Sequence, residues 1–379
     1  MEKFIAYNPT KLIFGQNCVS YLSKQVKDLG RKTLIVLGGN SAKKNGSYKH
    51  VLEQLKLSGI SYVEFWGIKP NPRIEEVENA IELGREEKVD FVIAIGGGSV
   101  IDSAKIIALC IPENLDPWQV MKNLQKPSKA LPLVVVLTLA ATGTEMNPYA
   151  VLQNDETKEK IGYTSQLIYP SISFCDPTYT LSVSKEYTAW GLADIAAHCL
   201  EAYFGNGGAY LSDKITVSIL KELIEIGDLL LINLDNYELR ERMMWASTCA
   251  LNGITFHGRK SGDWGVHDVA HNLSVLFDIP HGASLTVVFL AWMKLFKKEL
   301  NKRITWLGQE LFRVKNPNTT IKRFELLFMF WNCPINLSFL KLKPQQIEEF
   351  KQLLIKNKPT GMVHQLTEEH LVKLVELMK

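Results

Sequence analysis

The feature that most constrains the fold is a regular alternation of short apolar runs with helical patterns over the first half of the chain. Residues 33–39, 90–98 and 131–138 are rich in Val, Ile and Leu, which is typical of buried strands. Residues 73–88 repeat apolar side chains at spacings of three and four, which predicts an amphipathic helix. Further elements are expected as a helix over 49–59 and as a strand over 61–67, and the pattern changes after residues 171–177. Strands that alternate with helices predict a parallel sheet covered on both faces.

The second half of the chain has a different character. Long helical patterns, such as those over residues 186–204 and 212–234, follow one another with almost no strand-like alternation. The chain has 379 residues, which exceeds the size at which a single core usually stops growing. We therefore expect an α/β nucleotide-binding domain over residues 1–180 and an all-α domain over residues 181–379.

Composition argues against several classes of protein. The net charge of +3 is too small to indicate binding to nucleic acid or to a membrane surface. The longest apolar run, residues 131–141, is far shorter than the roughly 20 residues of a spanning helix, and the first residues lack the pattern of a signal peptide. Six cysteines without a CxxC pair indicate reduced thiols. We expect a cytoplasmic protein with no nucleic-acid or membrane partner.

A glycine cluster, AIGGGSVID, ends the expected strand at 90–98 and opens a helix. Gly97 and Gly98 let the backbone approach a ligand closely, and Ser99 is placed to cap the helix. The free N–H groups at such a helix start suit a pyrophosphate. A glycine turn without a ligand is the alternative, since the cluster is not the GxGxxG fingerprint. Its place at the carboxyl end of a central strand favours a nucleotide.

A second glycine loop, LGGNSAKKNG (37–46), follows the first strong strand. An acidic residue here would bind the ribose 2′-hydroxyl of NAD, but Gly39 and Ser41 are followed by Lys43 and Lys44. We therefore expect NADP(H) to be preferred over NAD(H); a surface turn with two solvated lysines is the alternative. Hydroxyls of Thr138 and of the loop over 141–145 are candidates for phosphate or ribose contacts, although such loops also cap helices.

Asp194 and His198 are four residues apart in an apolar, glycine-flanked helical pattern, so their side chains lie on one face. A buried carboxylate and imidazole need compensation, which a metal ion or a simple hydrogen bond between them provides. His267, His271 and His281 follow. Because His267 and His271 are also four apart, spacing alone does not say which of them binds a metal together with His281. Three imidazoles and a carboxylate suit a divalent first-row metal.

These motifs resemble the iron-containing (group III) alcohol dehydrogenase family, most closely its NADP-dependent aldehyde reductase and butanol dehydrogenase branch. The resemblance covers most of the chain, from residues 8–15 to at least residues 281–293. The most specific part is the combination of D-x3-H with H-x3-H-x9-HG. The other matching segments are GGNSAKKNG, NPRIEEV, GGGSVIDSAK, LTLAATGTE, CDPTYT, GLADIAAHCLEAY, ALNG and DWGVHDVAHNL.

The resemblance implies a fold like that of dehydroquinate synthase. It implies that Asp194, His198, His267 and His281 are the metal ligands and that His271 is the non-ligand histidine at the nicotinamide and substrate. The cofactor residues that it implies are Gly39, Ser41, Asn71, Gly97, Gly98, Ser99, Thr138, Thr142 and Lys160. The family favours Fe²⁺, whereas Zn²⁺ would bind such a set at least as tightly. A homodimer is expected, in which the first strand, residues 11–15, could pair across subunits.

The expected reaction is the reversible reduction of a short- or medium-chain aldehyde to a primary alcohol by NAD(P)H. Trp264 and Phe256 are candidates for an apolar pocket, although simple packing would explain them equally well. The first alternative is another enzyme of the same fold, either a polyol or glycerol-phosphate dehydrogenase or a lyase like dehydroquinate synthase; the fourth candidate ligand argues against it. The second is a non-catalytic nucleotide-binding protein, against which the complete ligand set and His271 argue.

Overall fold

The computed structural model describes all 379 residues, which pack into two compact units. The sheet unit comprises Tyr7–Val183 and Leu234–Asn252. The helical unit comprises Met1–Ala6, Ser184–Asn233 and Gly253–Lys379. The expected division at residue 180 differs from these units in two respects, because α9 (Tyr237–Leu251) packs with the sheet unit and the first six residues pack with the helical unit.

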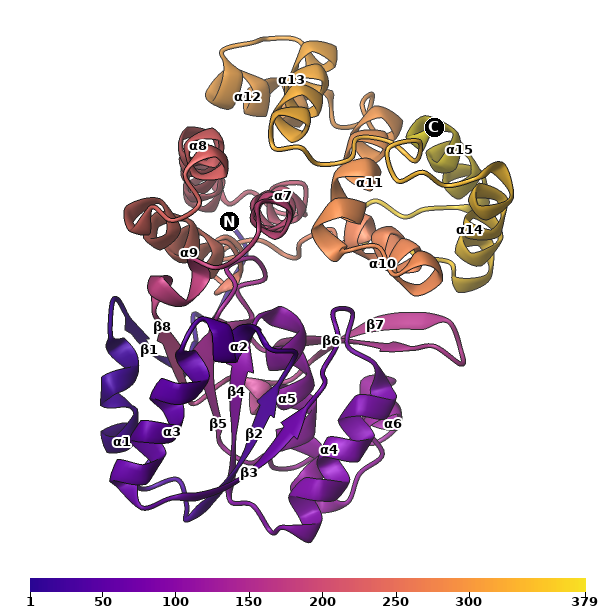
Figure 1. The fold of residues 1–379 in the computed structure, drawn as a ribbon. Helices are drawn as coiled ribbons and strands as arrows, with labels where there is room; N and C mark the ends of the chain where they lie inside the picture. Colours follow the sequence, from indigo (N-terminus) through magenta and orange to yellow (C-terminus); the bar gives the residue numbers. More distant parts are fainter. The chain divides into compact units, whose positions relative to one another are not determined.

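The sheet unit is built on a six-stranded parallel sheet with the order β1-β8-β5-β4-β2-β3 (Figure 1). Its strands are β1 (Lys11–Phe14), β2 (Lys32–Leu37), β3 (Ser61–Trp66), β4 (Phe91–Gly96), β5 (Leu133–Leu137) and β8 (Ile172–Cys175). Its helices are α1 (Leu22–Gln25), α2 (Ser41–Lys44), α3 (Ser47–Ser58), α4 (Ile74–Glu86), α5 (Gly98–Cys110), α6 (Pro117–Met121) and α9. The predicted parallel sheet is thus confirmed.

Both faces of the central strands are buried, which is why their sequences are continuously apolar. On one face, Ile35, Ile93 and Val134 pack in a core with side chains of α1 and α3. The intervening residues point to the opposite face, where α5 packs on β2, β4 and β5 and also contacts α4. A parallel sheet needs such covering on both sides, because each crossover helix must bury its own apolar stripe.

An antiparallel hairpin of β6 (Tyr149–Asn154) and β7 (Glu159–Thr164) was not predicted. The apolar run of β6 is only four residues long (YAVL), β7 has no such run, and the turn DETK at residues 155–158 is highly polar. Local hydrophobicity therefore gives a weak signal. The hairpin is held instead by its own cross-strand pairing and by contacts with α5.

The helical unit contains eight helices, so the predicted all-α second domain is confirmed as a fold class. They are α7 (Lys185–Tyr203), α8 (Tyr210–Ile232), α10 (Gly265–Phe277), α11 (His281–Leu295), α12 (Asn301–Phe312), α13 (Pro317–Phe330), α14 (Pro344–Asn357) and α15 (Glu368–Met378). Two of them, α7 and α11, pack against each other and are buried around almost their whole circumference. Polar side chains on such helices have no water to contact and need partners within the protein.

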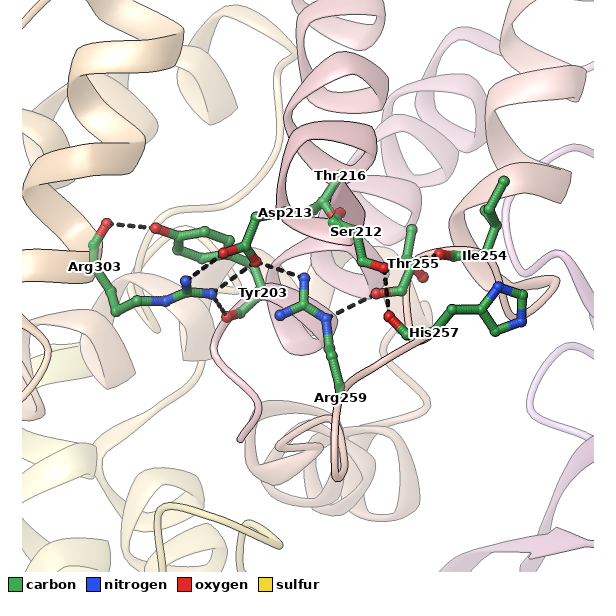
Figure 2. Close-up of polar contacts among 9 residues, drawn as sticks. All are labelled: Tyr203, Ser212, Asp213, Thr216, Ile254, Thr255, His257, Arg259 and Arg303. Atoms are coloured by element: carbon green, nitrogen blue, oxygen red, sulfur yellow. Dashed lines mark hydrogen bonds and ion pairs between the residues drawn. The ribbon is translucent and has the colours of Figure 1, made fainter. Parts of the chain in front are cut away.

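A buried ion-pair network joins four parts of the helical unit (Figure 2). Asp213 on α8 accepts hydrogen bonds from Arg259 Nη2 at 2.7 Å and from Arg303 Nη1 on α12 at 2.6 Å. The Arg303 guanidinium lies 3.6 Å from the ring centroid of Tyr203, at the end of α7, and Arg259 also donates to the carbonyl of Thr255. The Asp213 carboxylate therefore compensates the positive charges of two arginines, which would otherwise have no carboxylate partner within this network.

None of the helices combines the length and the apolar composition that crossing a bilayer requires.

Candidate metal centre and nucleotide-binding loops

Helix α7 presents a carboxylate and an imidazole to the same point. Asp194 and His198 are 3% and 4% exposed, and His198 Nε2 lies 3.6 Å from Asp194 Oδ1. The four-residue spacing places both on one face, as expected. Every other residue of this turn is apolar and buried, so the pair cannot be solvated.

Helices α10 and α11 bring two further imidazoles to this oxygen. His267 lies in the first turn of α10, and its Nε2 atom is 3.9 Å from Asp194 Oδ1. His281 is the first residue of α11, and its Nε2 atom is 3.8 Å from the same oxygen. Candidate ligand atoms of Asp194, His267 and His281 all lie within 4.8 Å of one another. His198 is stacked on His267, with ring centroids 5.0 Å apart. The structure thus brings Asp194, His267 and His281 together as one group, and His198 joins it through its approach to Asp194 Oδ1 rather than as a member of that group.

These separations fit a metal ion better than they fit hydrogen bonds. Distances of 3.6–3.9 Å are too long for a hydrogen bond. Donor atoms bound to a tetrahedral ion at about 2.1 Å lie roughly 3.4 Å apart, close to what is observed. Asp194 Oδ1 and His267 Nε2 are buried without a hydrogen-bond partner, which costs free energy unless a cation lies between them. The donor set therefore fits a divalent first-row metal.

Burial and charge act differently on the imidazoles. Burial lowers the pKa of His198 to about 4, although Asp194 opposes this shift, so the ring is neutral near pH 7 and has a lone pair for a metal. Burial also acts against charge on His267, but interactions with Asp194 and Glu201 outweigh it and raise its pKa to about 9. A metal ion that binds there must displace a proton from His267 at neutral pH.

His271 lies one turn after His267 on α10 and is 8% exposed. Its ring centroid is 5.4 Å from that of His281, whereas it is His267 that places Nε2 3.9 Å from Asp194 Oδ1 and forms a group with Asp194 and His281. The geometry therefore favours His267 as the ligand and His271 as a neighbour of the centre, a choice that spacing alone left open.

Glu201 is a residue of this centre that the sequence analysis missed. It lies on α7 and is 1% exposed, and its carboxylate contacts the ring of His267. A signal was available, because Asp194, His198 and Glu201 follow the spacing i, i+4, i+7 that places three polar side chains on one face of an apolar helix.

An aromatic pair adjoins the imidazoles. The Trp264 and Phe256 rings are stacked at 5.7 Å with an angle of 9°, and the Trp264 ring centroid is 5.3 Å from that of His267. Trp264 has a φ of +68°, a left-handed conformation that is costly for a large side chain. The backbone thus holds an apolar wall beside the candidate ligands.

In the sheet unit, the nucleotide candidates lie at the carboxyl ends of adjacent strands. β2, β4 and β5 are neighbours, and they are followed by Gly39, Gly97 and Thr138 respectively. Open α/β sheets bind ligands at this edge. Ser41, two residues after Gly39, is the first residue of the short helix α2, which lies within the expected loop.

The start of α5 approaches the loop after β5 so closely that a side chain would not fit. A Cβ atom on Gly98 would lie 2.6 Å from Thr142 Cγ2. The expectation that Ser99 caps this helix is wrong: α5 begins at Gly98, Gly97 occupies the cap position, and no side chain caps it. The N–H groups of Val100 and Ile101 donate to the Gly97 carbonyl, so those of Gly98 and Ser99 remain for a ligand.

Asn71 and Lys160, which are far apart in the sequence, come together. Lys160 Nζ on β7 donates to Asn71 Oδ1 at 2.7 Å, and both side chains are buried. Asn71 has a φ of +55° in the segment after β3, a conformation that Asn tolerates better than most residues. The hairpin that was not predicted thus positions one of the predicted cofactor residues.

Two charged side chains of GGGSVIDSAK, the half-buried Asp102 and the buried Lys105, were given no role in the sequence analysis. Lys105 donates to Thr144 Oγ1 at 2.6 Å and to the Tyr149 carbonyl at 2.6 Å, and Asp102 accepts from Thr144 Oγ1 and from the Val151 N–H. Burial lowers the pKa of Lys105 to about 8. The two charges connect α5 to the loop after β5 and to β6.

The chain therefore combines a parallel sheet with a phosphate-type helix start in one unit and a carboxylate–imidazole cluster in the other. Such a combination is typical of a metal-dependent nucleotide enzyme. Comparison with known families matches residues 9–177 to "Iron-containing alcohol dehydrogenase" and residues 188–378 to "Fe-containing alcohol dehydrogenase family, C-terminal". The chain belongs to the iron-containing alcohol dehydrogenase family, which confirms the resemblance.

Individual relatives agree. NADH-dependent butanol dehydrogenase A of Clostridium acetobutylicum is 43% identical, with 76% of this chain and 74% of the relative covered. NADPH-dependent aldehyde reductase YqhD of Escherichia coli is 38% identical over 77% and 75%. The crystal structure of a Thermotoga maritima protein named NADH-dependent butanol dehydrogenase A has a TM-score of 0.96 at 35% identity, with 100% of this chain and 99% of that chain covered. The chain is thus a nicotinamide-dependent oxidoreductase of the alcohol dehydrogenase and aldehyde reductase type.

Proposed function

We propose that this protein reduces short- and medium-chain aliphatic aldehydes to primary alcohols, and catalyses the reverse reaction, with Fe²⁺ held by Asp194, His198, His267 and His281. The observation that carries the proposal is the convergence of three imidazole Nε2 atoms on Asp194 Oδ1, which is buried and has no hydrogen-bond partner. The names of the butanol dehydrogenase and aldehyde reductase relatives support the substrate class.

When bound, a divalent ion supplies Lewis acidity at a carbonyl oxygen and a reduced nicotinamide supplies the hydride. The residues of the chain do the rest. The first turn of α5, with Gly97 and Gly98, offers N–H groups to the pyrophosphate. The Trp264 and Phe256 rings exclude water and favour an aliphatic chain. His271 passes the proton that the new hydroxyl requires, because an imidazole exchanges protons near neutral pH.

The direct test is the oxidation of NADPH and NADH with butanal by apo protein that has been reconstituted anaerobically with Fe²⁺ or with Zn²⁺. We expect turnover that depends on the added metal, since the centre otherwise contains only imidazoles and the carboxylates of Asp194 and Glu201. Protein without added metal is the control. Turnover only with a phosphorylated substrate would contradict the proposal and favour a glycerol-phosphate dehydrogenase, whereas no turnover in any panel would favour a nucleotide-binding protein.

We further propose that NADPH is preferred over NADH. The loop over residues 38–46 contains no carboxylate that would repel a 2′-phosphate, and Lys43 and Lys44 are exposed in it. Lys43 Nζ lies 4.2 Å from the ring centroid of Trp66, which places its charge beside the end of β3. One charge-assisted contact corresponds to about tenfold in kcat/KM.

The measurement is kcat/KM for both cofactors in the wild type and in the double variant Lys43→Ser, Lys44→Ser. We expect the double variant to lose about tenfold with NADPH and to be unchanged with NADH. Lys56→Ser, an exposed lysine on α3, is the control. An equal kcat/KM for the two cofactors in the wild type would contradict this preference and would agree with the NADH-dependent relatives.

His271→Ala is expected to lower kcat by about 100-fold while metal content stays unchanged, because general acid–base groups typically contribute 10²–10⁴-fold and His271 lies outside the ligand set. The pH dependence of kcat, together with metal content by elemental analysis, checks this. The variant should also lose the near-neutral step of the pH profile. A pH profile with the same shape and rate as the wild type would remove His271 from the proton path.

Two further parts of the proposal concern the setting of the enzyme. We propose a homodimer, supported by the position of β1 at the edge of the six-stranded sheet, where an exposed edge favours pairing with another strand. Light scattering during gel filtration tests it.

We also propose that the protein works in the cytoplasm, which agrees with six free cysteines, five of them buried.

A further inference from the structure

We propose that Glu201 is a positioning residue of the metal centre: its carboxylate orients the His267 ring so that Nε2, rather than Nδ1, faces Asp194. The inference rests on the proposed metal centre and deepens it. Glu201 does not belong to the group of candidate ligand atoms; it acts through His267.

The contacts of Glu201 are unusually complete for a buried side chain. Its Oε1 atom accepts from His267 Nδ1 at 3.1 Å and from the backbone N–H groups of His267 at 3.1 Å and Val266 at 3.0 Å. Its Oε2 atom accepts from the Trp264 N–H at 2.7 Å. Four donors on one segment thus point to a single carboxylate on another helix, and the side chain is 1% exposed.

These contacts determine which ring nitrogen can bind a metal. An ionised carboxylate can only accept, so Nδ1 of His267 must carry the hydrogen of that bond. A neutral imidazole then has its lone pair on Nε2, the atom that lies 3.9 Å from Asp194 Oδ1 and has no hydrogen-bond partner. Carboxylate partners of metal-binding histidines act in this way, and their loss typically lowers metal affinity by 10–100-fold.

The same carboxylate also stabilises the start of α10. Trp264 occupies the cap position of this helix with a φ of +68°, and no side chain of the cap residue accepts from the first turn. Glu201 supplies that acceptor from α7 instead. A test must therefore separate the orientation of His267 from the stability of the helix start.

Asp263 offers a matched control. It is a fully buried carboxylate beside the same helix start, and it accepts from the N–H groups of Val363, His364 and Gly265, but it does not contact the His267 ring. Asp263→Asn weakens backbone contacts at this position without changing the partner of Nδ1. Glu201→Gln replaces one carboxylate oxygen by an NH₂ group, which cannot accept a hydrogen bond. Because both oxygens of Glu201 accept from N–H groups, the NH₂ group must face a backbone N–H or the Nδ1–H of His267.

The experiment measures Zn²⁺ and Co²⁺ affinity of the full-length apo protein by competition with a chelator, alongside thermal unfolding of the apo protein and the visible spectrum of the Co²⁺ form. We expect Glu201→Gln to weaken affinity by about 10–100-fold and to alter the Co²⁺ spectrum. Asp263→Asn should lower the unfolding temperature and change affinity by less than about threefold. Glu201→Asp, which withdraws the carboxylate by one methylene, should give an intermediate affinity and serves if Glu201→Gln does not fold.

Equal affinity in Glu201→Gln and in the wild type, or equal losses in Glu201→Gln and Asp263→Asn, would overturn the role of Glu201 while leaving the metal centre intact. If the wild type binds neither Zn²⁺ nor Co²⁺ more tightly than Asp194→Ala does, the proposed metal centre is wrong. The role of Glu201 would then be wrong with it.

Discussion

Asp194→Ala is expected to lower turnover with butanal by at least about 1,000-fold and to remove the bound metal. The three imidazole Nε2 atoms lie 3.6–3.9 Å from Asp194 Oδ1, so the substitution removes a ligand together with the carboxylate on which they converge. Lewis-acid stabilisation by a metal contributes several kcal/mol, and about 4 kcal/mol corresponds to about 1,000-fold in rate.

The measurement combines metal content with kcat/KM after reconstitution with Fe²⁺. Asp268→Ala is the matched control, because it removes a carboxylate from the first turn of α10 that accepts from the Thr360 N–H and lies outside the ligand group. We expect that variant to retain its metal. Full metal occupancy in Asp194→Ala, with turnover within tenfold of the wild type, would contradict the proposed centre.

Asp213→Ala is expected to lower the free energy of unfolding by about 3–5 kcal/mol. Breaking a buried ion pair on one side leaves its partner charge uncompensated. Asp213 and Arg259 are 7% and 5% exposed, and both Arg259 and Arg303 donate to this carboxylate (Figure 2). The substitution would leave two guanidinium groups beside each other with no carboxylate between them.

Denaturant unfolding followed by tryptophan fluorescence measures this effect. The control is Glu310→Ala, which removes an exposed ion pair with Lys221 at 3.7 Å in the same unit; exposed pairs contribute about 0–1 kcal/mol. Because Asp213 lies outside the ligand group, the variant should retain metal as long as it is folded. Losses of similar size in the two variants would show that the network contributes no more than a surface pair.

Much of the sheet unit could be predicted because its elements depend on local patterns. Residues 91–98 and 131–137 are continuously apolar, and β4 and β5 lie within them, since a strand covered on both faces buries every side chain. The hairpin of β6 and β7 lacks such a pattern. Its strands form because they pair with each other and pack on α5, so the sequence carried little sign of them.

The boundary between the units shows a similar limit. α9 has a helical pattern like its neighbours in the chain, yet it packs with the sheet unit, against the segment Pro177–Thr180 and the loop at Thr144–Met146. Periodicity predicts that a helix forms and which face is apolar. It does not identify the apolar surface that this face will cover.

In the centre itself, the sequence by itself determined that Asp194 and His198 share a face of one helix, because a period of 3.6 residues requires it. The glycine cluster after the strand could also be recognised in the sequence, and the structure adds that a Cβ atom on Gly98 would press on the Thr142 side chain. Only the tertiary structure decided that His267 rather than His271 faces Asp194, and that Glu201 accepts from the His267 ring 66 positions away. The physical reason is that helical spacing acts within a few residues, whereas the meeting of α7, α10 and α11 depends on how their buried faces pack.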